Sequence, residues 1–284
     1  MKASTTSAPD VRPAAKESWQ LRLFRKSLKK QQKLAALLKL IGPLTPAQQC
    51  LLVTCGDNNG ALNWHFKQHD GRWTWADAES ESSGQIAELT GDEVLAVDKD
   101  NPNIPVVDDT FDLVVTIDVH EHLESTALLN RELARVVKPG GRVVVTTPGG
   151  DPRKLANRIK GWVGMDKSDY GHVVDGYDVP ALQSQLRLAE LTPVAKSSYS
   201  RFFTEMLELG INLAYVKVLS RRSQAKVEQG QIAPQNQDQV KSVEKTIKLY
   251  GLIYPGIWLV SQLDRLLPFT EGHAVIVTAV KERA

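Results

Sequence analysis

The segment at residues 106–149 constrains the fold most, because it reads as strand, helix, glycine turn and strand. Residues 111–117 are a short apolar run rich in β-branched side chains, which is typical of a parallel strand buried on both faces. Residues 142–147 repeat that pattern after the turn Lys138-Pro139-Gly140-Gly141. The segment therefore predicts a right-handed βαβ unit, whose ligand lies beyond the carboxyl ends of the strands, at residues 118–123.

Helical spacing connects these two strands, over residues 123–137. One apolar stripe along it is formed by Leu128, Leu129, Leu133 and Val137. Further strands are predicted at residues 50–54, 73–77, 94–98, 192–199 and 274–280. Short apolar runs alternate with helical segments in this way in α/β domains.

Charge divides the chain unevenly. Residues 1–41 hold ten Lys or Arg against two acidic residues, a net charge of +8, whereas the whole chain has +2, so the remainder carries −6. Residues 1–16 are predicted as a disordered leader and residues 18–41 as one basic amphipathic helix. The shared apolar face of that helix consists of Leu34, Leu37, Leu38 and Ile41.

The cellular compartment is predicted from two features. The two cysteines, Cys50 and Cys55, cannot form a disulfide framework, and the polar first residues lack the apolar core of a secretory signal. We therefore expect a protein of the reducing cytoplasm.

The phrases IPVVDDTFDLVVTIDVHEHL and ELARVVKPGGRVVVTTPG resemble the class I S-adenosylmethionine-dependent methyltransferases, in particular the type 11 group that includes the ubiquinone and menaquinone biosynthesis methyltransferases. The resemblance covers residues 46–200. It implies a Rossmann-like sheet of seven strands, six parallel and one antiparallel. We accordingly divide the chain into residues 1–45, leader and helix; 46–200, cofactor-binding core; 201–271, a helical insertion or cap at the edge of the domain; and 272–284, the final strand.

The loop after the first strand is the first candidate for cofactor binding. A glycine-rich turn lets backbone N–H groups approach a ligand, and the following helix N-terminus favours its carboxylate. The resemblance implies contacts from Thr54, Gly56, Asp57, Asn58 and Gly60. This loop departs from the family pattern, because Leu52 stands at the usual acidic position and Thr54 at the first glycine.

Acidic residues follow the next two strands. Asp77 lies 21 residues after Gly56, near the spacing at which such folds place a carboxylate on ribose hydroxyls, and Glu79 is its competitor. By resemblance, an aspartate after the third strand accepts a hydrogen bond from the adenine amino group. Both Asp98 and Asp100 are candidates, and each of these acids could also be a surface charge.

The fourth strand leads into the predicted centre of the chemistry. Methyl transfer from a sulfonium is an in-line displacement that depends on positioning and on exclusion of water. Asp118 and Val119 are predicted to line the methionine end of the cofactor, and His120 to contact the substrate as a base. A divalent metal at Asp118, Glu121 and His122 is an alternative, but ligand spacing alone does not define a site, and no metal is predicted.

A lid over the substrate is predicted at residues 169–186. His172, Tyr170 and Tyr177 are its candidate contacts, with His172 the second predicted catalytic residue. An exposed loop histidine is the alternative.

Residues 249–263 run without a charge but are shorter than the ~18 to 20 residues that span a bilayer. This helix could pack on the domain, form a homodimer contact, or join the basic helix in peripheral contact with anionic lipid. Nucleic acid is not expected as a partner, because no aromatic-interleaved basic groove is present.

The resemblance implies transfer of a methyl group from S-adenosylmethionine to an oxygen, carbon or nitrogen of a small-molecule or lipid-linked acceptor. A methyltransferase-like scaffold that has lost cofactor binding is the main alternative, favoured by Leu52 and Thr54. An NAD-dependent oxidoreductase is disfavoured, because the glycine spacing lacks the dinucleotide fingerprint.

Overall fold

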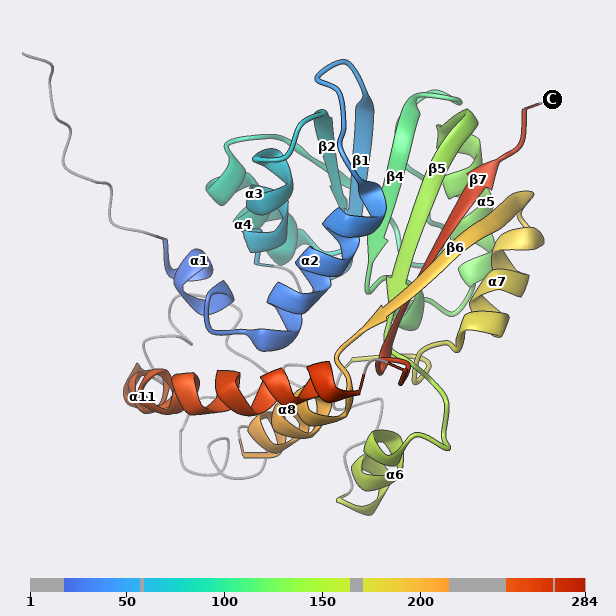
Figure 1. The fold of residues 1–284 in the computed structure, drawn as a ribbon. Helices are drawn as coiled ribbons and strands as arrows, with labels where there is room; N and C mark the ends of the chain where they lie inside the picture. The colour runs from blue at the N-terminus through green and yellow to red at the C-terminus, as the bar shows by residue number, and fades with distance from the viewer. Residues whose placement is uncertain (1–17, 57–58, 164–170, 215–243, 268, 284) are drawn as a thin grey trace, which may run out of the picture.

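Seven strands form one sheet in the order β3-β2-β1-β4-β5-β7-β6 (Figure 1). The computed structural model describes residues 18–56, 59–163, 171–214, 244–267 and 269–283. The strands are β1 (Gln49–Thr54), β2 (Arg72–Asp77), β3 (Val94–Ala96), β4 (Phe111–Ile117), β5 (Val137–Thr147), β6 (Leu191–Tyr199) and β7 (Ala274–Lys281). Strands β1 to β5 pair in parallel, and β7 runs antiparallel to β5 and β6. The predicted sheet, with a single antiparallel strand, is confirmed.

Helices cover both faces of this sheet. Those of the described residues are α1 (Trp19–Phe24), α2 (Leu28–Ile41), α3 (Ala61–Lys67), α4 (Ser80–Thr90), α5 (Thr126–Val136), α6 (Leu155–Trp162), α7 (Val179–Arg187), α8 (Phe202–Ala214) and α11 (Glu244–Ser261), with the short 3-10 turns η1 (His120–His122) and η4 (Gln262–Leu266).

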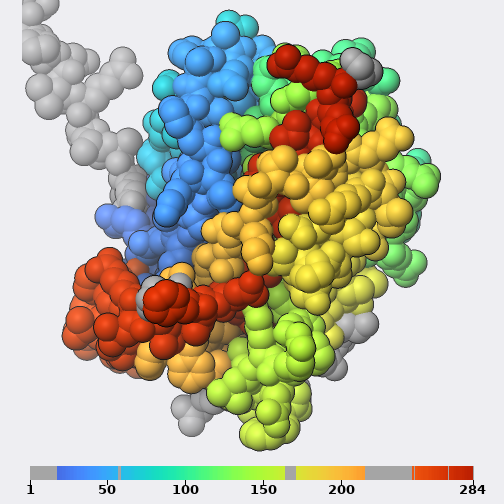
Figure 2. All heavy atoms as spheres, turned by 45° about the vertical axis from the view of Figure 1, so that its right-hand side comes forward, coloured from blue at the N-terminus to red at the C-terminus, as the bar shows by residue number. Residues whose placement is uncertain are grey.

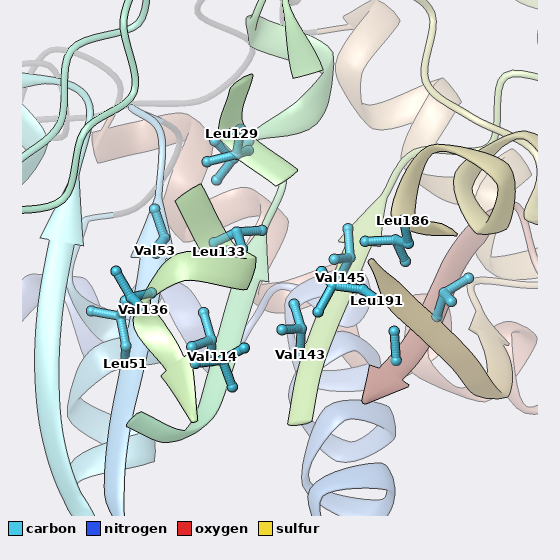
Figure 3. Close-up of a cluster of buried hydrophobic side chains, with 14 of the residues drawn as sticks. Leu51, Val53, Val114, Leu129, Leu133, Val136, Val143, Val145, Leu186 and Leu191 are labelled. Atoms are coloured by element: carbon cyan, nitrogen blue, oxygen red, sulfur yellow. The ribbon is translucent and has the colours of Figure 1, made fainter. Parts of the chain in front are cut away.

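Alternate residues of the strands supply two separate hydrophobic clusters. Val114 packs with the helices α5 and α7 in the cluster drawn in Figure 3, whereas Leu113 and Val115 pack with α2, α3 and α4 on the other face. Leu52 is fully buried in the second cluster, so an acid there would be enclosed among apolar side chains. Burial of both faces explains why the strands read as continuous apolar runs.

The turn after α5 differs from the prediction. Phe111 pairs with Val137 and Leu113 pairs with Arg142, so Lys138 to Gly141 form a bulge within β5 instead of a turn before it. A Cβ atom on Gly141 would lie 2.8 Å from the carbonyl oxygen of Lys138, which explains the need for glycine. The predicted stripe was also wrong at Leu128, which is 40% exposed, and Val137 belongs to the strand.

The predicted single helix at residues 18–41 is in fact two helices, α1 and α2, with a break at residues 25–27. The side-chain amide of Gln31 donates hydrogen bonds to the carbonyl oxygens of Phe24 and Arg25, which satisfies the last turn of α1. Leu37 and Ile41 are buried as expected.

Figure 1 shows α6, α8 and α11 at the end of the sheet toward which the parallel strands run. Helix α8 contacts α2, α6 and α11, so these helices form a cap over the strand ends. No helix among the described residues is long and apolar enough to cross a membrane. The predicted disordered leader, Tyr170 and residues 215–243 of the predicted insertion lie outside the described residues.

Candidate functional site

The loop between β1 and α3 is built on two glycines in the left-handed region. Gly56 has φ +71° and Gly60 has φ +85°. A Cβ atom at Gly60 would lie 3.0 Å from Cα of Ile86 in α4, so the loop packs tightly against that helix. Asp57 and Asn58 lie outside the described residues. Gly56 and Gly60 thus adopt the backbone conformation that favours glycine, and the ligand contacts predicted for the loop stay predictions.

Asp77, at the end of β2, is 1% exposed and connects β1, the loop after it and α4. Its carboxylate accepts hydrogen bonds from the Thr54 hydroxyl, the Ser82 hydroxyl at 3.0 Å, and the backbone N–H groups of Glu79 at 2.8 Å and Gly56 at 3.4 Å. Burial raises the pKa of Asp77, and these four donors oppose that rise. The carboxylate that the sequence predicts for a ribose is therefore already surrounded by protein donors.

Glu79 is the accessible acid at this strand end. Its side chain is 42% exposed and forms an ion pair with Lys99. The carboxylate lies directly over Gly56, because a Cβ atom at that glycine would be 2.5 Å from it. Asp98 and Asp100 are exposed beyond the end of β3, and the Asp98 carboxylate accepts a hydrogen bond from the N–H of Asp100 at 2.9 Å. Glu79 and the two aspartates are thus all open to a ligand.

Asp118, the first residue after β4, has a left-handed backbone, with φ +51°. Its Oδ2 atom forms an ion pair with Nζ of Lys33, from α2. Sequence reasoning missed Lys33, although Lys33, Leu37 and Ile41 recur at a spacing of four residues on the buried face of that helix. A lysine on an apolar helix face was the available signal. This ion pair connects α2 to the end of β4.

Val119 and His120 are enclosed rather than open. Val119 is 1% exposed and His120 has no exposed surface. Nε2 of His120 lies 2.9 Å from the side-chain oxygen of Asn130, and burial lowers the pKa of the imidazole to about 4. In this conformation His120 has no surface with which to meet an acceptor, so its predicted contact with substrate stays a prediction.

Glu121, His122 and His172 come together beside Asp118. One possible metal-ligand atom from each lies within 4.8 Å of the others, and the two imidazole rings meet edge to face at 4.8 Å between centroids. The loop that carries His172 is fixed by the N–H of Val173, which donates to the carbonyl of Glu121 at 2.7 Å. Burial, followed by the charge of His122, lowers the pKa of His172 to about 3. The predicted lid residue thus meets the turn after β4, while Tyr177 packs edge-on against His120.

A second polar cluster, which the sequence did not predict, lies under the cap. Glu205 of α8 is 2% exposed and pairs with Lys29 of α2 at 3.1 Å, Lys160 of α6 at 3.4 Å and His273 at 3.4 Å. Ser200 donates a hydrogen bond to Glu205 at 2.7 Å. Burial alone would raise the pKa of Glu205, but these cations hold it below its ordinary value.

Comparison with known families and structures places the site in context. The family model described as a methyltransferase domain matches residues 51–145, from β1 to β5. No curated protein matches the sequence.

Solved structures with the same fold cover most of the chain at low identity. Phosphoethanolamine N-methyltransferase 2 from Haemonchus contortus, in complex with S-adenosyl-L-methionine, matches with a TM-score of 0.54 and 15% identity, over 89% of this chain and 53% of that one. The YcgJ protein from Bacillus subtilis matches with a TM-score of 0.51 and 14% identity, over 89% and 100% of the two chains. The [4+2]-cyclase SpnF matches with a TM-score of 0.53 and 16% identity, over 90% and 84%. These likenesses establish the fold, and the cyclase illustrates that the fold alone does not fix the reaction.

Proposed function

We propose that this protein, which has the class I methyltransferase fold and matches the methyltransferase-domain model over residues 51–145, transfers a methyl group from S-adenosylmethionine to an acceptor bound under the cap. The observation that carries the proposal is the pair of left-handed glycines after β1, Gly56 and Gly60, beside exposed acidic side chains at the ends of neighbouring parallel strands. Ligands of open α/β sheets bind at that edge.

The cofactor is assigned to the loop and to the strand ends around it. We assign Thr54, Gly56 and Gly60 to cofactor contacts, together with Asp57 and Asn58, which lie outside the described residues. Glu79 replaces Asp77 as the group that meets the ribose hydroxyls, since it is exposed over Gly56 whereas Asp77 is engaged by four protein donors.

The remaining contacts follow the order of the sheet. We assign Asp98 or Asp100 to the adenine side, because both are exposed beyond β3. Asp118 and Val119 lie at the methionine end, next to the turn that carries His120. His172, which is partly exposed, is the stronger candidate to touch the acceptor, and His120 acts behind it as a positioning residue.

Calorimetric titration of the full chain with S-adenosylmethionine and, separately, S-adenosylhomocysteine tests the proposal. The key variant is Gly60→Ala, which places a side chain at φ +85° and against α4, so the loop must be distorted before it can bind. We expect wild-type protein to bind both compounds and Gly60→Ala to bind about tenfold more weakly, which corresponds to ~1.4 kcal/mol. The matched control is Gly84→Ala in α4, where a Cβ atom meets nothing within 4 Å.

A scaffold without cofactor is the second candidate, and the occupied carboxylate of Asp77 favours it, together with Leu52 and Thr54 at the positions that depart from the family pattern. Failure of folded wild-type protein to bind either compound would establish it over methyl transfer. Binding that is equal in Gly60→Ala and wild type would leave the cofactor but remove it from this loop.

We also propose that the acceptor is lipophilic and that α11 rests on a membrane surface. Leu252, Ile253 and Leu259 of this helix are 78%, 51% and 65% exposed, and Figure 2 shows α11 standing out from the body of the molecule. Apolar side chains exposed in such a group mark a contact surface. Sedimentation with lipid vesicles tests this proposal.

A further inference from the structure

Each of the three side chains of the turn η1 has a buried polar atom without a hydrogen-bond partner among the described residues: Nδ1 of His120, Oε1 of Glu121 and Nε2 of His122. Glu121 accepts a hydrogen bond from the Thr147 hydroxyl through Oε2, at 3.0 Å, while its Oε1 atom is buried without a hydrogen-bond partner. Nε2 of His122 is likewise buried without a partner. Proteins rarely leave such atoms without a hydrogen-bond partner. Their occurrence together in one short turn therefore indicates a missing ligand.

The contact of Nδ1 determines which ring nitrogen of His122 carries the proton. Nδ1 lies 3.0 Å from the carbonyl oxygen of Gly171, which can only accept, so Nδ1 carries the proton. In the neutral ring Nε2 then has a free lone pair. A backbone carbonyl on the far nitrogen and a hydroxyl on the far oxygen are the outer contacts that orient ligands in metal sites.

His172 completes the set from another part of the chain. Its ring nitrogen and the ligand atoms of Glu121 and His122 all lie within 4.8 Å of one another. Among the described residues, this is the one group of three such side chains at that separation. Asp118, which the sequence grouped with Glu121 and His122, pairs with Lys33 through Oδ2, whereas its Oδ1 atom is buried without a hydrogen-bond partner.

We propose that Glu121, His122 and His172 bind a divalent transition-metal ion of the zinc class. Two imidazole nitrogens and one carboxylate oxygen suit zinc and its neighbours, whereas magnesium and calcium prefer sites made of oxygen. Three protein ligands leave a coordination position open, and both histidines are partly exposed, so a further ligand can reach the ion.

The open position assigns an acceptor class, an inference that rests on the proposed function. An acceptor hydroxyl bound to the ion loses its proton to water more readily, because the ion stabilises the oxyanion. The oxygen lone pair then forms the bond to the methyl carbon, the carbon–sulfur bond breaks, and the sulfonium sulfur keeps that electron pair and becomes neutral. The acceptor would therefore be an alcohol or a phenol.

Titration of chelator-treated full-length protein with Co²⁺, followed by visible absorption and by competition with Zn²⁺, tests the metal site without any need for activity. We expect one saturable Co²⁺ site in the wild type and in the control His69→Ala, whose histidine lies elsewhere, near the carbonyl of Gly42. His122→Ala and His172→Ala should each weaken Co²⁺ binding at least about tenfold. Glu121→Gln keeps the shape of the side chain and serves where an alanine variant does not fold.

Absence of a saturable Co²⁺ site in folded wild-type protein would overturn the proposal, and so would equal affinity in wild type and in the folded ligand variants. S-adenosylhomocysteine is titrated into the same samples to separate the two hypotheses. Cofactor binding without Co²⁺ binding removes only the metal, whereas Co²⁺ binding without cofactor binding keeps the metal and removes methyl transfer.

Discussion

Asp77 is positioned to stabilise the fold, whether or not it meets a cofactor. Its carboxylate joins β1, the loop after it and the start of α4 through four donors. We predict that Asp77→Ala lowers the free energy of unfolding by about 3 kcal/mol, because hydrogen bonds to a charged group are lost and buried hydroxyls remain unpaired. Urea denaturation of the two proteins measures the change.

The matched control for Asp77→Ala is Asp98→Ala, since Asp98 is an exposed aspartate at the next strand end. A surface substitution there should change the free energy of unfolding by no more than about 0.5 kcal/mol. Equal stability of the two variants would contradict a structural role for Asp77.

At the residue scale, the sequence predicted where strands end better than it predicted the surroundings of the side chains there. The strand ends at Thr54, Asp77 and Asp118 follow from runs of apolar residues, whose length fixes where each strand stops. Burial of Asp77 and His120 does not follow, because the number of protein donors around a side chain depends on contacts distant in sequence. Lys33 was missed for the same reason, since its partner lies 85 residues away.

Glu205 connects the helices α8, α2 and α6 and His273, and we predict that its charge stabilises the fold. The carboxylate of α8 contacts Lys29 of α2, Lys160 of α6 and His273 beside β7. Glu205→Gln leaves the ammonium groups of Lys29 and Lys160 without their anion and should cost about 3 kcal/mol of unfolding free energy near neutral pH. His273 is neutral at that pH, because burial lowers its pKa to about 3. The control is Glu271→Gln, which removes an exposed carboxylate paired with Lys196 and should change stability little.

The effect of Glu205→Gln should also depend on pH. The pKa of Glu205 is held below its ordinary value of 4.5 in the folded protein, so its charge stabilises the fold fully above that value. The stabilisation is lost as the pH falls below 4.5 and the unfolded chain takes up the proton first. The stability difference between wild type and variant should therefore be constant above about pH 5 and shrink below it. A difference that grows in acid would refute this account.

At the scale of elements, periodicity predicted the strands well and the helix boundaries less well. A buried strand needs only local apolar composition, as in β4, whereas the break between α1 and α2 depends on the side chain of Gln31. The bulge in β5 was also hidden, because the Pro139-Gly140-Gly141 sequence fits both a turn and a bulge. Only the pairing of Phe111 with Val137 distinguishes the two.

In the whole molecule, α11 contacts the segment formed by α1 and α2, so elements far apart in the sequence pack together in the cap. Tyr250 of α11 donates a hydrogen bond to the carbonyl of Lys26 at 2.7 Å, and Gln31 of α2 donates to the hydroxyl of Tyr254 at 2.9 Å. These tyrosines thus attach α11 to the N-terminal helices. Lys29 and Lys33 are likewise turned inward, to Glu205 and Asp118, so they do not add to a basic membrane surface.

Any membrane contact must therefore depend on apolar side chains more than on charge. We predict that the double variant Leu252→Glu, Leu259→Glu reduces binding to vesicles of neutral and anionic lipid alike. Burial of an aliphatic side chain contributes about 1.5 to 3 kcal/mol, so even partial loss at two positions should weaken binding at least tenfold, or ~1.4 kcal/mol. The matched control is Leu188→Glu, an equally apolar residue, 74% exposed at the end of α7.

Binding only to anionic vesicles, abolished by salt and unchanged in the double variant, would assign the contact to basic residues instead. Failure of the wild type to bind either vesicle would leave the exposed face of α11 to a second copy of the chain, which sedimentation equilibrium would detect as a dimer.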